Sequence, residues 1–84
     1  MNYPTQTDNP SKATSYCGWT NYETWNVALW LQNEHYLYQV ARECLTFYEF
    51  RTRMKDVFWK TPDGVLLTDR KLNLDELDEC ITEL

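Results

Sequence analysis

Three pairs of polar residues have the spacing of a helix capping box, in which two side chains satisfy the free backbone N–H groups at a helix start. The pairs are Thr20 with Glu23, Thr46 with Glu49, and Asn73 with Glu76. Starts this close together leave room only for short helices, because each helix must end before the next begins. The spacing therefore predicts a mainly α fold, a compact bundle of about four short helices.

Apolar periodicity and helix breakers set the expected extent of the first three helices. The first covers about residues 21–32, and the second covers residues 33–43 with Asn33 as its N-cap. The third begins after Thr46 and ends near residue 59 or 60, because Pro62 forces the residue before it out of helical geometry.

Two of these helices differ in how their apolar residues are distributed. The third has one apolar stripe, which we expect to enter the core, formed by Phe47, Phe50, Met54, Val57 and Phe58. The first is apolar nearly all round, and only Glu23 and Asn26 mark a solvent side. A helix of this kind is normally central. We therefore expect either the rest of the chain or a partner to cover Trp30.

Between the third and last helices the chain changes character. Residues 61–64, Thr-Pro-Asp-Gly, have the composition of a tight turn, and residues 65–67 form a short extended run. We expect this run to pack across the helices, with a small β pairing as the alternative. The last helix starts at Asn73, and its inner face is formed by Leu74, Leu77, Cys80, Ile81 and Leu84.

Residues 1–16 contain two prolines and almost no aliphatic side chains, so we expect a flexible N-terminal arm ahead of a single helical domain at residues 17–84. A chain of 84 residues has room for only one domain. It carries four Trp, six Tyr and three Phe, and so small an interior cannot hold every ring. Some aromatic rings must therefore lie at the surface.

The net charge of −5 is concentrated near the C-terminus. Residues 61–84 hold seven of the 13 acidic residues and two of the eight basic ones, so the remainder of the chain is neutral. Five carboxylates lie on the last helix: Asp75, Glu76, Asp78, Glu79 and Glu83. They form either a solvated face or an anionic ridge that binds a basic protein surface, with Trp30, Tyr38 and Trp59 as aromatic anchors.

The same charge argues against general nucleic-acid binding, which needs clustered Lys and Arg. A strip of Tyr48, Arg51, Lys55 and Trp59 on the third helix keeps single-strand binding open as a weaker alternative. No apolar stretch is long enough to span a membrane, and the N-terminus has no signal-peptide pattern. We therefore expect a cytoplasmic protein.

Catalytic and metal-binding patterns are missing from the sequence. The three cysteines, Cys17, Cys44 and Cys80, are widely spaced, with no CxxC pair and a single histidine, His35. Neither His35 nor Cys44 has an identifiable partner for acid–base or nucleophilic chemistry. We therefore expect buried, reduced thiols, no metal, no cofactor and no enzymatic activity.

Residues 18–31 read GWTNYETWNVALWL, and this box resembles the hallmark of a family of small uncharacterised proteins from prokaryotes, their plasmids and their phages. Asn33, Glu34, Leu37 and Tyr38 continue the resemblance, as do residues 63–84. The resemblance implies a role on mobile elements, in the contest between a phage or plasmid and its host.

Together these features predict an acidic phage or mobile-element protein that binds and blocks a basic functional surface of a host protein complex, such as a CRISPR or restriction effector. The alternative from another class is a homo-oligomeric module in which the first helix forms a dimer. A single-strand nucleic-acid accessory protein is the third hypothesis.

Overall fold

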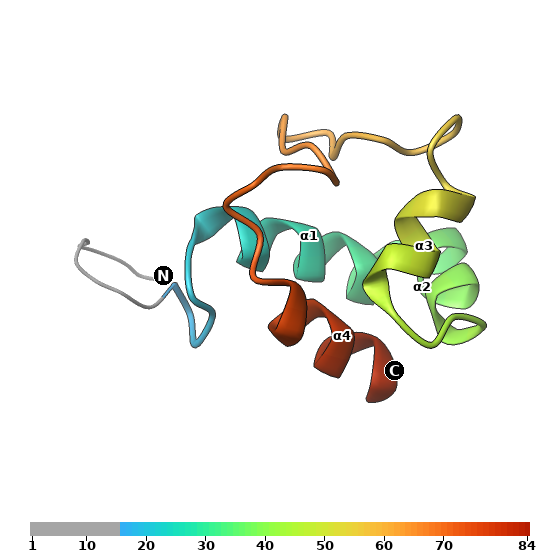
Figure 1. Cartoon of the computed structure of the whole chain (residues 1–84), viewed down its shortest axis with the longest axis horizontal. Coiled ribbons are helices and arrows are strands. Elements are labelled where there is room, and N and C mark those ends of the chain that lie inside the picture. The colour runs from blue at the N-terminus through green and yellow to red at the C-terminus, as the bar shows by residue number, and fades with distance from the viewer. Residues whose placement is uncertain (1–15) are drawn as a thin grey trace.

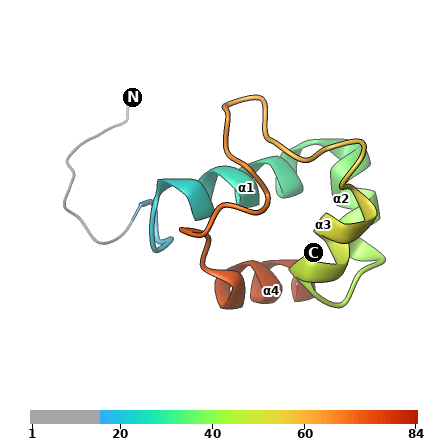
Figure 2. The same ribbon diagram turned by 45° about the horizontal axis from the view of Figure 1, so that its top comes forward.

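The computed structural model describes residues 16–84, which form four helices (Figure 1). They are α1 (Tyr22–Asn33), α2 (His35–Arg42), α3 (Phe47–Arg53) and α4 (Leu74–Thr82). The predicted mainly α class with four short helices is confirmed. The expected arm lies outside the described residues except for Tyr16. In Figure 1 and again in Figure 2, α1 lies between residues 60–72 on one side and α4 on the other, so α1 is the central element.

The N-caps of α1 and α2 are not the residues that the sequence pattern predicts. Asn21, and not Thr20, caps α1, because its side chain accepts from the N–H of Thr24 at 2.9 Å. The N–H and the hydroxyl of Thr20 are instead bonded to residues at the start of α4. Asn33 is the last residue of α1, and the carboxylate of Glu34 caps α2.

The other two predicted caps are confirmed. Thr46 accepts from the N–H of Glu49, and Asn73 accepts from the N–H of Glu76, both at 3.1 Å. Neither glutamate bonds back to its own cap. Glu49 accepts from the N–H of the residue before Thr46, and Glu76 accepts from the N–H of Thr20. Each glutamate therefore joins its helix start to a segment outside the helix.

Helix α3 is shorter than predicted and ends at Arg53. The N–H of Leu67 donates to the carbonyl of Trp59 at 3.0 Å, and this antiparallel pairing holds residues 59–61 extended. Residues 54–57, between α3 and this pairing, form turns instead of continuing the helix. Val57, which the periodicity placed on the core stripe, lies in this turn segment and is 68% exposed.

Residues 59–67 form a small hairpin around the Thr-Pro-Asp-Gly turn. The N–H of Thr61 donates to the carbonyl of Val65, and the N–H of Gly64 donates to the carbonyl of Thr61, both at 2.8 Å. Gly64 has a φ of +97°, which glycine adopts without strain. These features match a three-residue hairpin loop that ends in a bulge. The small β pairing considered as an alternative is therefore present, as an isolated bridge.

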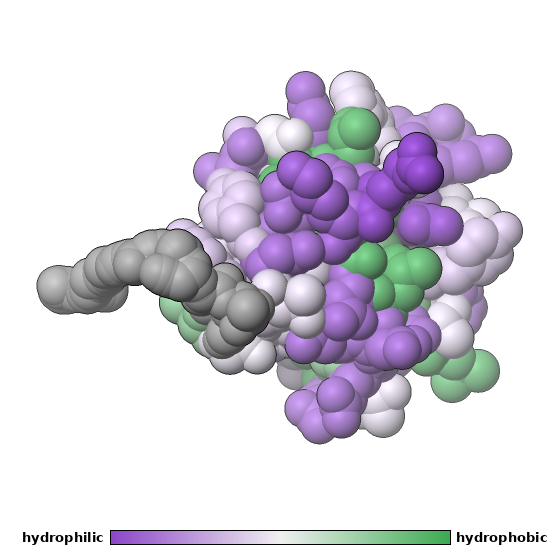
Figure 3. Space-filling model, turned by 60° about the vertical axis from the view of Figure 1, so that its left-hand side comes forward, coloured by the Kyte–Doolittle hydropathy of each residue, from purple (hydrophilic) through white to green (hydrophobic). Residues whose placement is uncertain are grey.

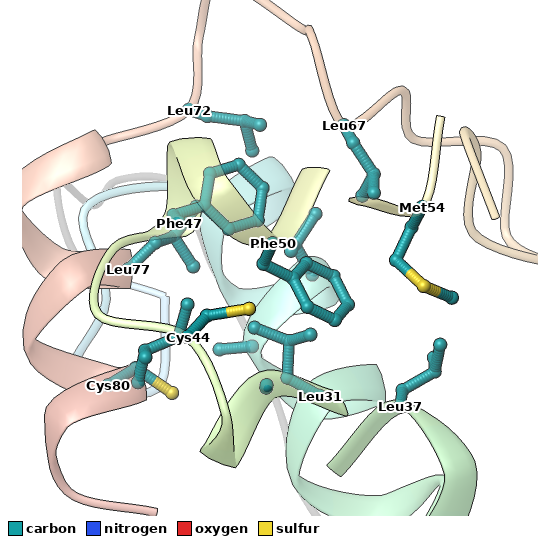
Figure 4. Close-up of a cluster of buried hydrophobic side chains, with 14 of the residues drawn as sticks. Leu31, Leu37, Cys44, Phe47, Phe50, Met54, Leu67, Leu72, Leu77 and Cys80 are labelled. Carbon is teal, nitrogen blue, oxygen red and sulfur yellow. The ribbon is translucent and has the colours of Figure 1, made fainter. Parts of the chain in front are cut away.

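Two phenylalanines of α3 form the centre of the core (Figure 4). Phe47 and Phe50 are fully buried, and their stacked rings have centroids 6.1 Å apart. Around them lie residues from every helix and from the hairpin: Val27, Ala28, Leu31, Leu37, Ala41, Cys44, Met54, Val65, Leu67, Leu72, Leu77, Cys80 and Ile81. Leu74, expected on the inner face of α4, is 44% exposed, and Leu72 just before the helix is buried instead.

Phe50→Ala and Val57→Ala test where α3 ends. The apolar periodicity places both residues on one buried stripe, whereas the structure buries only Phe50. Phe50 is fully buried, so its truncation is expected to lower the free energy of unfolding by about 3–5 kcal/mol. Val57 is exposed, so its truncation should change that energy by no more than about 0.5 kcal/mol. Urea denaturation followed by circular dichroism measures both. Equal losses would contradict the end of α3 at Arg53.

Candidate functional site

Three of the five predicted carboxylates lie along one exposed edge of α4. Asp75, Glu79 and Glu83 follow one another at intervals of four residues, which places them on the same side of the helix. All three are exposed, and none forms a salt bridge with another residue of the 16–84 region. We refer to these three residues as the acidic edge. It is a row of charge that the described part of the chain does not neutralise.

The other two predicted carboxylates, Glu76 and Asp78, bind backbone groups of distant segments. Glu76 accepts from the N–H of Thr20 at 3.0 Å, which joins α4 to the segment before α1. Asp78 accepts from the N–H of Phe47 at 2.8 Å, at the start of α3, where free N–H groups and the helix dipole favour an anion. Both side chains are only partly exposed, and each already has a partner within the chain.

The three predicted aromatic anchors lie on α1, α2 and the hairpin. Trp30 is half-buried, packs against the core and donates its Nε1–H to the hairpin at 3.0 Å. The guanidinium of Arg42 lies over the ring of Tyr38, 5.6 Å from its centroid. Trp59 is 54% exposed, and the ammonium of Lys60 lies 5.0 Å from its ring centroid. The structure therefore distributes these rings over separate elements, and none of them lines the hollow beside α4.

A hollow of 290 Å³ opens beside the acidic edge. It is lined by Gly18, Trp19, Gln32, Glu76, Glu79, Cys80 and Glu83. Of these residues Cys80 is buried, whereas Glu79 and Glu83 are exposed, so we refer to Cys80 as the bottom of the hollow and to the two glutamates as its rim. Sequence reasoning missed Trp19 and Gln32 because both are far from α4 along the chain. The available signal was that Glu76, Glu79 and Glu83 share one helical face.

A two-residue turn positions Trp19 at this hollow. Tyr16 and Trp19 pair through two backbone hydrogen bonds, and Cys17 and Gly18 between them have φ of +53° and +91°. Positive φ at both central residues is the pattern of a type I′ turn. The ring of Tyr16 packs against two aromatic rings of α1, which fixes the turn on the domain. Tyr16 thus lies with the helical domain.

The box at residues 18–31 binds α1 to the hairpin through polar side chains. Asn26 is only 1% exposed, although the periodicity placed it toward solvent. Its Nδ2 donates to a carboxylate oxygen of Asp63 at 2.8 Å, and its Oδ1 accepts from the hydroxyl of Thr61 at 2.6 Å. The same Asp63 oxygen accepts from Nε1 of Trp30. Asn26 can be buried because the hairpin satisfies both ends of its amide.

The start of α1 is bonded to the chain that leads into α4. The side-chain amide of Asn21 donates to the carbonyl of Lys71 at 2.6 Å, and the buried hydroxyl of Thr24 accepts from the N–H of Asn73 at 2.9 Å. The polar residues of the box are therefore engaged in holding the fold.

The cysteines divide into two buried thiols and one exposed thiol. Burial raises the pKa of both Cys44 and Cys80, which keeps them protonated and weakly nucleophilic. Cys17 is exposed because it lies in the turn before α1, in contrast to the expectation of buried thiols. Within residues 16–84, no three His, Cys, Asp or Glu side chains are grouped to hold a metal ion. No helix in the same region is long and apolar enough to cross a membrane.

These features define a small α-helical domain closed by polar contacts around α1, with unneutralised carboxylates beside an aromatic-walled hollow. The chain belongs to a family of unknown function, DUF7249, which matches residues 12–84. The matched region contains every element of the described fold. No curated protein and no solved structure matches the chain.

Asp63→Asn probes the contact between α1 and the hairpin through its pH dependence. Hydrogen bonds from Asn26 and Trp30 lower the pKa of the Asp63 carboxyl. A carboxylate of this kind stabilises the fold above its unfolded-state pKa of about 3.9, and this contribution is lost as the pH falls through the lower folded-state value. We expect the wild type to be more stable than Asp63→Asn at neutral pH, with the difference shrinking in strong acid.

Chemical denaturation at a series of pH values measures this difference. Asp56→Asn is the matched control, because Asp56 is also exposed and its side chain accepts no hydrogen bond from the described residues 16–84. A stability difference for Asp63→Asn that stays constant at every pH would show that the charge of Asp63 does not hold the hairpin to α1.

Proposed function

We propose that this chain is an acidic binding protein of phage or mobile-element origin that covers a basic functional surface of a protein complex in the cytoplasm of its host. The observation that carries the proposal is the acidic edge, whose three carboxylates have no salt-bridge partner among residues 16–84. A partner surface rich in Lys and Arg would supply the charges that the edge lacks.

The charge distribution favours a basic partner while the two proteins approach each other, as well as in the complex. The whole net charge of −5 derives from the segment that contains α4, so the field on that side attracts a basic surface and raises the association rate. Screening limits this attraction to about 8 Å at physiological ionic strength. Binding should therefore weaken as salt is added.

The surface itself favours polar recognition. The face seen in Figure 3 is mainly hydrophilic, and its hydrophobic residues form small patches separated by polar ones. Obligate assemblies bury broad apolar interfaces, whereas transient complexes have mixed and wetter ones. A charge-led, reversible complex fits this face better than a permanent apolar one.

The proposed origin and the kind of partner rest on the resemblance of the box at residues 18–31 to proteins of phages and plasmids. A protein this small blocks a larger complex most simply by occupying the place of its substrate. The partner that suits this chemistry is a basic groove that ordinarily holds nucleic acid, as in a CRISPR or restriction effector. Carboxylates can compete there for the Lys and Arg that phosphates would contact.

Two alternative functions, a homo-oligomeric module and a single-strand nucleic-acid accessory protein, have less support from the arrangement of the described residues. A homodimer through the first helix needed a free apolar face, but the core-facing residues of α1 are buried and Trp30 is bonded to the hairpin. Single-strand binding needed one helix face to carry the strip from Tyr48 to Trp59, but α3 ends at Arg53. The acidic edge is therefore the surface on which we base the proposal.

Charge reversal at Glu79 tests the proposal. Immobilised wild-type chain and Glu79→Lys are incubated with host lysate at low and high salt, and the bound proteins are identified by mass spectrometry. We expect a partner whose recovery falls about tenfold with Glu79→Lys, equivalent to about 1.4 kcal/mol, and falls again at high salt. The activity of the recovered complex is then measured with and without added chain.

Asp56→Lys is the matched control, because it changes the net charge by the same amount at an exposed residue outside α4. We expect this variant to retain the partner. A partner that binds all three proteins equally, at every salt concentration, would remove the acidic edge from the mechanism.

A further inference from the structure

Cations and aromatic rings of this chain pair with one another at three places. Arg42 lies over Tyr38, Arg51 over Tyr48 and Lys60 over Trp59, at 5.6, 5.4 and 5.0 Å from the ring centroids. Such pairs are attractive because the face of an aromatic ring is negative. Within residues 16–84, no cation lies over the ring of Trp19. Trp19 shares this with several other rings, but it is the aromatic residue that lines the hollow beside α4, where it is partly buried against the core.

The surroundings of Trp19 increase its preference for a cation. Glu76, Glu79 and Glu83 line the same hollow, at positions that share one face of α4. Glu76 uses one oxygen to accept from the N–H of Thr20, whereas Glu79 and Glu83 have no salt-bridge partner in the described chain. The hollow therefore combines an indole with free negative charge.

The size and composition of the hollow indicate what kind of cation it fits. Its 290 Å³ lies at the small end of the range of about 300–1,000 Å³ that is typical of ligand sites, which suits a small group such as one side chain. A metal ion is a poor candidate, because no three ligand groups converge within residues 16–84. The buried thiol of Cys80 at the bottom is neutral and suits an alkyl stem.

We infer that the hollow between Trp19 and α4 is a docking site for an arginine side chain presented by a basic protein partner. This inference rests on the proposed function, since it names the group that the acidic surface receives. A guanidinium stacks on an indole and donates parallel N–H groups to carboxylates, whereas an ammonium is a compact point charge without a stacking plane. Trp19 is the stacking wall, and Glu79 and Glu83 accept the hydrogen bonds at the rim.

The walls of the hollow are fixed before any ligand arrives. The contact between Thr20 and Glu76 holds the turn against α4, and Nε2 of Gln32 donates to Sγ of Cys80 at 3.4 Å, which joins α1 to α4. A preformed site spends little binding energy on ordering. The docking site should therefore be detectable with a short peptide as well as with a whole partner.

The probe is an acetylated and amidated Gly-Arg-Gly peptide, titrated at low salt into the isotope-labelled full chain and followed by NMR. We expect the indole N–H of Trp19 and the backbone amides around Glu79 and Glu83 to shift together. The same peptide with citrulline in place of arginine keeps the shape and loses the charge. It should bind at least about fivefold more weakly, because both the cation–π and the ionic contributions are removed.

Three variants locate the binding. Glu83→Gln, at an exposed residue of the rim, should weaken the arginine peptide by about two- to fivefold. Asp75→Asn removes the same charge from the acidic edge at a residue that does not line the hollow, so its effect should be smaller. Trp19→Leu should weaken binding by about two- to fivefold through the lost cation–π contact, and its circular dichroism spectrum reports whether the fold is kept.

Each outcome decides between the hollow and the wider surface. Equal losses for Glu83→Gln and Asp75→Asn would mean that arginine binds the whole acidic edge, which leaves the proposed function standing and overturns the docking site. Equal binding of the arginine and citrulline peptides, or no shift at about 10 mM peptide, would also overturn it. Failure of the proposed function would be seen in a different experiment, the lysate capture. There the partner would bind Glu79→Lys as well as it binds the wild type.

Discussion

The contact between Asp63 and Asn26 is the constraint on which the arrangement of this domain depends. A side-chain amide in the middle of the central helix can be buried only if both its ends are satisfied, and an unpaired one costs about 1–3 kcal/mol. The hairpin supplies the carboxylate of Asp63 to one end and the hydroxyl of Thr61 to the other. The hairpin must therefore lie across α1. Its pairing begins near Trp59, after the turns that follow α3, and α4 lies on the opposite side of α1 (Figure 1).

Sequence reasoning succeeded where a few neighbouring residues decide the structure. Thr46 and Asn73 cap the helices that the pattern assigned to them, because a cap is satisfied three residues away. It failed where a distant residue competes. Thr20 is bonded to α4, and Asn26 is bonded to a residue 37 positions away. The periodicity within one helix contains no information about such distant partners. Val57 is exposed because α3 ends at Arg53 and residues 54–57 form turns, which the apolar spacing does not reveal.

The same contrast between what neighbouring residues decide and what distant residues decide holds for the candidate site. Composition locates five carboxylates on α4, but it cannot separate Glu76 and Asp78, which bind backbone N–H groups, from residues that remain free. That distinction depends on which helix start lies opposite each side chain. The hollow was equally beyond prediction, since Trp19 and Gln32 reach it from opposite ends of the first helical region. Counting charges in the sequence thus identifies α4 as the acidic part of the molecule. The tertiary contacts then show which of its carboxylates bind backbone groups and which do not.

The hydrogen bonds that fix the start of α1 join residues separated by 49–56 positions along the chain. The acceptors and donors at residues 71–76 follow α1, α2, α3 and the hairpin along the chain, so the start of the central helix is fixed by one of the later segments of the fold. Contacts of such long range are formed late in folding because the intervening loop must first be closed. A fragment cut short before residue 71 would therefore lack the partners that hold the start of its central helix.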